Sequence, residues 1–142
     1  MSHEEFRTVV KALITNRGRI LIVKQEDDSE WHIPEGHLES DEQPEEAVKR
    51  VVKQDIGLEV DVHQVVDIST FSWQGGEKDS IRIVYHVESD DEEVVLKDDL
   101  DEVKWINPEE LKQQLTDSEA YRFDERDNLD NFLEKMIKTP VF

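Results

Sequence analysis

The chain has 142 residues, the size of one ordinary domain, so we expect a single domain over residues 1–142. The absence of cysteine excludes disulfides, thiolate zinc sites and iron–sulfur clusters. Lys and Arg number 17 against 36 Asp and Glu, a net charge of −19, so no basic stripe is available to neutralise phosphates and we expect neither a nucleic-acid nor a membrane partner. The N-terminus has no basic segment followed by an apolar one, and a cytoplasmic location is expected.

The first half of the chain predicts a hairpin, a short extended segment and a helix. Residues 6–24 read as two strands around a Gly-containing turn at 16–19. Residues 31–34 should be extended, because the residue before a proline avoids helical backbone angles. A helix is expected from about Pro44 to Ile56, with proline in its first turn, apolar residues at helical spacing and Gly57 as its stop.

The second half predicts further strands at 58–68, 70–73, 80–87, 94–96 and 103–106, and helices at 109–115 and 124–138. The strand at 80–87 shows the period-two alternation of a half-buried strand. Strands, hairpins and helices are interleaved along the chain. This order favours an α/β fold with a mixed β-sheet flanked by helices over a doubly wound parallel sheet.

The segment 36–58 carries the chemistry. It contains Gly36, then Glu42, then Arg50, and it ends in Gly57-Leu58. This spacing resembles the signature of the Nudix hydrolase family, which is Gly, five residues, Glu, seven residues, then Arg-Glu-apolar-any-Glu-Glu-any-Gly-apolar. The resemblance implies an α/β/α sandwich around a mixed sheet. It also implies a divalent-metal-dependent hydrolase that acts on a nucleoside diphosphate linked to another moiety.

The signature is degenerate, because its three helix acids are Val51, Gln54 and Asp55 in this chain. The resemblance implies that these positions bind the metal and help to activate water. Only Asp55 keeps a charge, while Gln54 offers a neutral amide oxygen. We therefore expect weakened catalysis and weak binding of Mg²⁺ or Mn²⁺, with Asp55 and Gln54 as ligands and with Glu39 and Glu102 as further candidate ligands.

Arg50 has two interpretations. By resemblance it orders the acids of the loop and helix, Glu42 among them, and the alternative is a surface pair with Glu46 one helical turn earlier. The segment Pro34-Glu35-Gly36-His37 is similar to a Pro-Lys-Gly-His variant of dinucleoside-polyphosphate hydrolases, although Glu35 replaces the lysine.

The expected substrate is a small nucleotide or dinucleotide, bound by a monomer or a homodimer. Trp73 and Tyr85 are candidates for stacking on its base, and either could equally belong to the core.

Three functions follow from this sequence: a slow metal-dependent hydrolase, an inactive nucleotide-binding or sensor module, and a structural or interaction domain. If Val51 faces an open groove, Val51→Glu together with Gln54→Glu should raise hydrolysis at least about tenfold. A thermal-shift screen with and without Mg²⁺ separates the three. Metal-dependent stabilisation with turnover indicates the hydrolase, stabilisation without turnover indicates the binding module, and neither effect indicates the structural domain.

Overall fold

The computed structural model of this protein describes residues 6–25, 31–73, 78–97, 100–116 and 126–138. Within these residues the elements follow in the order β1 (Phe6–Asn16), β2 (Arg19–Gln25), β3 (Trp31–His32), β4 (Glu35–His37), α1 (Pro44–Ile56), β5 (Asp61–Trp73), β6 (Lys78–Glu88), β7 (Leu100–Ile106), α2 (Pro108–Thr116) and α3 (Arg126–Lys138). None of these helices is long and apolar enough to cross a membrane.

The strands form one mixed sheet. Its main path runs β3-β2-β1-β6-β5, with β4 paired to β1 and β7 paired to β2. β1 and β6 are parallel over ten residue pairs, from Phe6 opposite Asp79 to Thr15 opposite Glu88, and the other pairings are antiparallel. The expected mixed sheet is confirmed.

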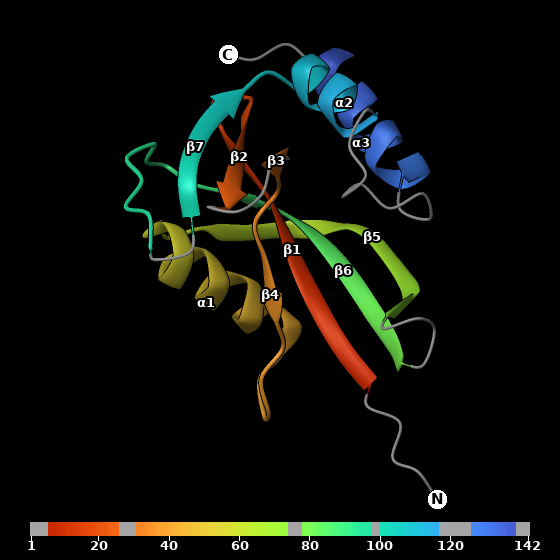
Figure 1. Cartoon of the computed structure of the whole chain (residues 1–142). Coiled ribbons are helices and arrows are strands. Elements are labelled where there is room, and N and C mark those ends of the chain that lie inside the picture. Colours follow the sequence, from red (N-terminus) through yellow and green to blue (C-terminus); the bar gives the residue numbers. More distant parts are fainter. Residues whose placement is uncertain (1–5, 26–30, 74–77, 98–99, 117–125, 139–142) are drawn as a thin grey trace, which may run out of the picture.

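Helices cover both faces of the sheet (Figure 1). Because side chains alternate along β1, Val10, Ala12 and Ile14 enter the core beneath α1, whereas Leu13 enters a second core with Leu111 of α2 and Leu133 of α3. The predicted α/β/α sandwich is therefore observed. The first core is the larger one, and it anchors the helix that carries most of the signature.

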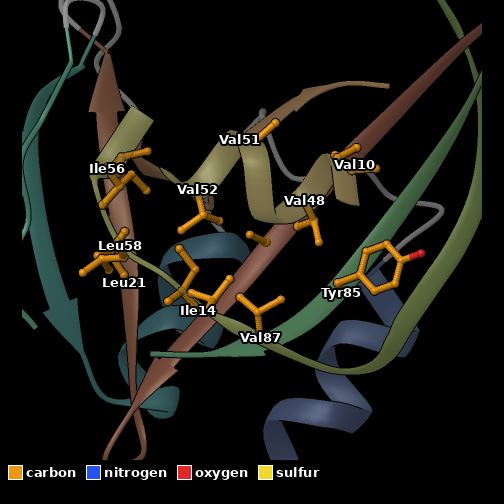
Figure 2. Packing of buried hydrophobic residues seen from close by; sticks show 14 residues of the cluster. Val10, Ile14, Leu21, Val48, Val51, Val52, Ile56, Leu58, Tyr85 and Val87 are labelled. Carbon is orange, nitrogen blue, oxygen red and sulfur yellow. The ribbon is translucent and has the colours of Figure 1, made fainter. Parts of the chain in front are cut away.

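The predicted helix is confirmed from Pro44 to Ile56. Its apolar stripe is buried against the sheet, with Ala47, Val48 and Val52 fully covered (Figure 2). Gly57 ends the helix with φ +79°, a left-handed conformation, and its N–H donates to the carbonyls of Lys53 at 3.0 Å and Val52 at 3.2 Å.

Three predicted strands are corrected. Residues 94–96 form no strand; instead the amide of Val95 donates to the Ile56 carbonyl at 2.8 Å and that of Lys97 donates to the Asp55 carbonyl at 3.1 Å. The last carbonyls of a helix lack partners within it, and the amides of residues 94–97 supply two of those partners. The separate strands at 58–68 and 70–73 are one strand, β5, which starts at Asp61 and contains two bulges.

Candidate active site

Arg50 joins the loop after β4 to helix α1. Its Nε donates to Glu42 Oε2 at 2.7 Å and its Nη2 donates to Glu42 Oε1 at 3.1 Å, so the guanidinium grips the carboxylate with two bonds. Nη2 also donates to the His37 carbonyl at 2.7 Å, and Nη1 donates to Gln54 Oε1 at 3.1 Å. Arg50 thus contacts Glu42 of the loop, the acid that the resemblance assigned to it, and its role in the site stays a prediction.

Glu42 completes the loop by accepting a bond from the amide of Glu39 at 3.0 Å. The side chain of Glu42 is 12% exposed and that of Arg50 22%, so the pair is shielded better than an ordinary surface ion pair. The hydrogen bond from Arg50, and then the Glu39 amide, hold the pKa of Glu42 below its usual value. The same hydrogen bond raises the pKa of Arg50, because it stabilises the charged guanidinium. Glu42 therefore serves as a fixed negative charge that holds Arg50 in place.

Val51 occupies the position of the first signature acid, and it is only 3% exposed (Figure 2). It belongs to the core beneath α1, and its methyl groups press against the backbone of Gly36 in β4. A Cβ atom at position 36 would collide with one of these methyl groups. Two signature positions thus form one close helix–strand contact, which only a glycine at position 36 admits. Position 51 does not open onto a groove.

Asp55, the remaining helix acid, is half-buried and lines a cavity of about 70 Å³ between α1, β2, β3 and β4. The other lining residues are Val23, His32, Ile33, Pro34, Glu35 and Leu100. Gln54 is exposed, and its amide oxygen already accepts the bond from Arg50. Of the two signature positions of the helix that keep a ligand oxygen, Asp55 is the one that lines this cavity.

The signature leaves one helix carboxylate, Asp55, as a candidate ligand for a divalent cation. No group of three or more His, Asp or Glu side chains is arranged to hold a metal ion in the part of the chain that the structure describes. Mg²⁺ needs only one or two protein carboxylates when phosphate and water oxygens complete its shell. Asp55 meets that requirement, and the buried Val51 excludes the fuller set of carboxylates.

The other predicted ligands lie at the edges of this arrangement. Glu39 is exposed, and its Oε1 lies 3.5 Å from Arg50 Nη1. Glu102 is exposed on β7 opposite Lys24, one residue along β2 from Val23 in the cavity wall. The structure thus brings Glu39 to the Arg50 network. Glu102 alternates with Val103, which packs on the core beneath α1, so Glu102 lies on the other face of β7 and does not line the cavity of Asp55.

The two predicted stacking residues are placed differently. Tyr85 is buried in the core beneath α1 (Figure 2), where burial and then the charge of Glu45 raise its pKa. Tyr85 is 6% exposed, which favours the core role of the two that the sequence left open, and its stacking on a base stays a prediction. The side chain of Trp73 lies outside the described residues.

Sequence reasoning missed two polar features. The guanidinium of Arg7 in β1 donates to the ring of His37, with one contact of 2.8 Å, although thirty residues separate the two. On the sheet face turned away from α1, Lys11, Asp67 and Arg82 are buried. The alternation of β6 identified the face of Arg82, but it could not show that this face is covered.

Comparison with known proteins identifies the class. The chain matches the NUDIX domain model over residues 5–126. The nucleoside triphosphatase NudI of Escherichia coli O139:H28 is 29% identical over 119 residues, covering 74% of this chain and 84% of that protein.

Solved structures agree on the fold. A MutT protein from Methanosarcina mazei Go1 superposes with a TM-score of 0.73 at 22% identity, covering 98% of this chain and 100% of that chain. A C. elegans Ap4A hydrolase superposes with a TM-score of 0.67 at 16% identity, covering 91% and 98%. This chain belongs to the Nudix family of hydrolases.

Proposed function

We propose that this chain hydrolyses a phosphoanhydride bond in a small nucleotide, a nucleoside diphosphate linked to another moiety, with one divalent cation and at a low rate. The observation that carries the proposal is the Arg50 network, which fixes the loop at His37 and Glu42 to the helix that carries Asp55. An ordered loop and helix around one carboxylate offer a fixed place for a diphosphate. The names of the relatives, a nucleoside triphosphatase and an Ap4A hydrolase, support a nucleotide substrate.

Asp55 would hold the cation, Mg²⁺ or Mn²⁺, with phosphate and water oxygens as its other ligands. Gln54, Glu39 and Glu102 remain candidates for outer contacts. Such an ion neutralises diphosphate charge and orients an attacking water. Arg50 and Glu42 position the loop, and Trp73 remains a candidate for stacking on the base. Because acids are missing at positions 51 and 54, we expect a rate about 10²–10⁴ below that of a complete site.

A second candidate is a nucleotide-binding module without turnover. The burial of Val51 favours it, because the helix gains a packing residue at a position where the resemblance implies a metal-binding acid. Both candidates share the loop, the helix and the cavity. They differ in whether a single carboxylate suffices for chemistry.

The test compares wild type with Asp55→Asn in two measurements. Phosphate release from a nucleotide panel, after coupled phosphatase treatment, reports turnover with Mg²⁺ or Mn²⁺. Calorimetric titration with Mn²⁺ reports the ion site directly. We expect weak single-site binding and slow turnover in wild type, and loss of both in Asp55→Asn.

Asp79→Asn is the matched control, because Asp79 is an exposed aspartate of β6 that lines neither the cavity of Asp55 nor the pocket beside Arg50. It should leave binding and turnover unchanged. Nucleotide-dependent thermal stabilisation without any turnover in wild type would replace the hydrolase by the binding module. Tight binding of two ions would show that acids other than Asp55 form the metal site.

A further inference from the structure

Two histidines from neighbouring strands stack on each other on the sheet. The ring centroids of His63 in β5 and His86 in β6 lie 5.0 Å apart, and the ring planes differ by 24°. The register of these strands skips His63, since Val62 pairs with Val87 and Gln64 pairs with His86. His63 is therefore the extra residue of a β-bulge, a feature that redirects a side chain. Here the bulge places one imidazole on the other.

The second ring also meets helix α3. Phe132 of α3 lies against His86 with centroids 5.1 Å apart and the planes tilted by 55°. On its other side, His86 Nε2 shares a hydrogen bond of 2.8 Å with Thr15 Oγ1 in β1. His86 is half-buried among β1, β5 and α3. The docking of α3 on the sheet thus includes a direct contact with a titratable ring.

The two rings differ in their electrostatic surroundings. His63 is 46% exposed, and its Nε2 lies 3.4 Å from Glu88 Oε1, so a proton on His63 has a carboxylate partner. Burial, and then the neighbouring His63, lower the pKa of His86, and Glu88 opposes this shift only in part. On α3, Asp130 and Glu134 act on Lys112 of α2, whose pKa they raise. Among the described residues, the charged groups that act on His86 are therefore His63 and Glu88.

We propose that His63 and His86 form an acid-sensitive pair that controls the docking of α3 on the sheet. Above the ordinary histidine pKa the ring of His86 is uncharged, stacked on His63 and tilted against Phe132. A proton on His86 would place a cation in a half-buried site, 5.0 Å from the ring of His63 and against the aromatic ring of Phe132. Release of α3 hydrates His86 and relieves this cost. The device is independent of the proposed hydrolysis.

The sign of the effect follows from proton linkage. Because the pKa of His86 is depressed in the docked state, the undocked state binds a proton at this ring more readily than the docked state does. The docked state is therefore fully favoured above pH 6.5, the ordinary histidine pKa, and it loses this advantage as the pH falls below 6.5. At pH 5.5 a free imidazole of pKa 6.5 is about ten times more often charged than neutral, so the undocked state of α3 can gain up to about tenfold in population. Protonation of the many carboxylates alters global stability at the same time, so the measurement must be local.

The experiment is amide hydrogen exchange, followed by mass spectrometry at pH 7.5 and pH 5.5 and corrected for intrinsic rates. The protection of α3 should fall severalfold to about tenfold relative to that of α1, which serves as internal reference. His86→Gln, which keeps a polar group near Thr15, should remove the pH response. His63→Gln, at an exposed position that tolerates substitution, should reduce it. His32→Gln, a histidine on β3 away from α3, should leave the response unchanged.

Histidine NMR titration supplies the second readout. The pKa of His86 should lie below the ordinary value of 6.5 in wild type, and it should move up towards that value in His63→Gln. Equal protection of α3 at both pH values would overturn the proposal. A full pH response that persists in both His86→Gln and His63→Gln would overturn it as well. If His86→Gln does not fold, the His63→Gln comparison decides.

Discussion

Replacing Val51 by glutamate measures directly whether the first acid position of the signature is a core position in this chain. Val51 is 3% exposed and contacts the backbone of Gly36. A glutamate there must either carry an unpaired charge in the core or stay protonated. Each unit by which its pKa rises above about 4.3 costs about 1.4 kcal/mol once the pH exceeds that pKa. At pH 7 this reasoning gives a loss of about 2–4 kcal/mol in unfolding free energy.

The pH dependence distinguishes this mechanism from simple loss of packing. Because the folded-state pKa of the new carboxyl is raised, its penalty is absent below about pH 4.3 and grows as the pH rises towards the folded-state pKa. Urea denaturation at pH 5 and pH 7.5 should therefore show Val51→Glu approaching wild type at the lower pH. Gln54→Glu is the matched control. It introduces the same carboxylate three residues along the same helix, at an exposed position beside Arg50, and should stay within about 0.5 kcal/mol of wild type.

A Val51→Glu protein as stable as Gln54→Glu at both pH values would refute the reasoning. Position 51 would then reach water, and the expectation from sequence that the double substitution raises hydrolysis at least about tenfold would regain its basis. Because Val51 is buried, we expect the double mutant to lose stability rather than to gain activity.

Three further predictions concern the Arg50 network and the helix–strand contact. Arg50→Lys should lower turnover by about 10–100-fold, because an ammonium cannot grip Glu42 through two parallel bonds, and steady-state kinetics will measure the loss. Because the pKa of Glu42 is depressed, its ionised carboxylate stabilises the fold above pH 4.5, its ordinary pKa, and this stabilisation is lost as the pH falls through the folded-state pKa. In Glu42→Gln, the unfolding free energy measured with urea should therefore vary less with pH in that range, and an unchanged slope would contradict this. Gly36→Ala should cost about 1–3 kcal/mol through its collision with Val51, and Val51→Ala should recover part of that loss in a double-mutant cycle, whereas additive effects would show that the two residues do not touch.

The sheet and the helices were predictable because their signals are periodic and local. The apolar stripe of α1, with proline at its start and glycine after its end, places the helix at 44–56 from sequence alone. The prediction divides the strand at 61–73 at Ser69, and it misses the bulges at His63 and Val66, which shift the alternation twice. Bulges depend on pairing with a partner strand, and a single strand carries no record of that partner.

The site was predictable in its members but not in its geometry. Arg50 and Glu42 could be paired by resemblance, whereas the burial of Val51 depends on how closely β4 crosses α1 at Gly36. The position of Tyr85 required knowledge of which sheet face α1 covers. The contact between Arg7 and His37 spans thirty residues, and it exists because β4 pairs with β1 rather than with its neighbour in sequence.

The signature of this chain separates into two physical parts, of which one is intact. Gly36, Arg50 and Glu42 hold the loop against the helix through a close packing contact and a guanidinium–carboxylate pair, and neither interaction involves a metal ion. The other part is the set of acids to which the resemblance assigns the metal, and it is reduced to Asp55. The space that an acid at position 51 would need is filled by a core valine. The loop can therefore remain ordered with or without a cation, because its order rests on bonds within the protein. Substrate positioning can thus be retained while the rate falls, so a slow hydrolase and a nucleotide binder differ here only in what one carboxylate can support.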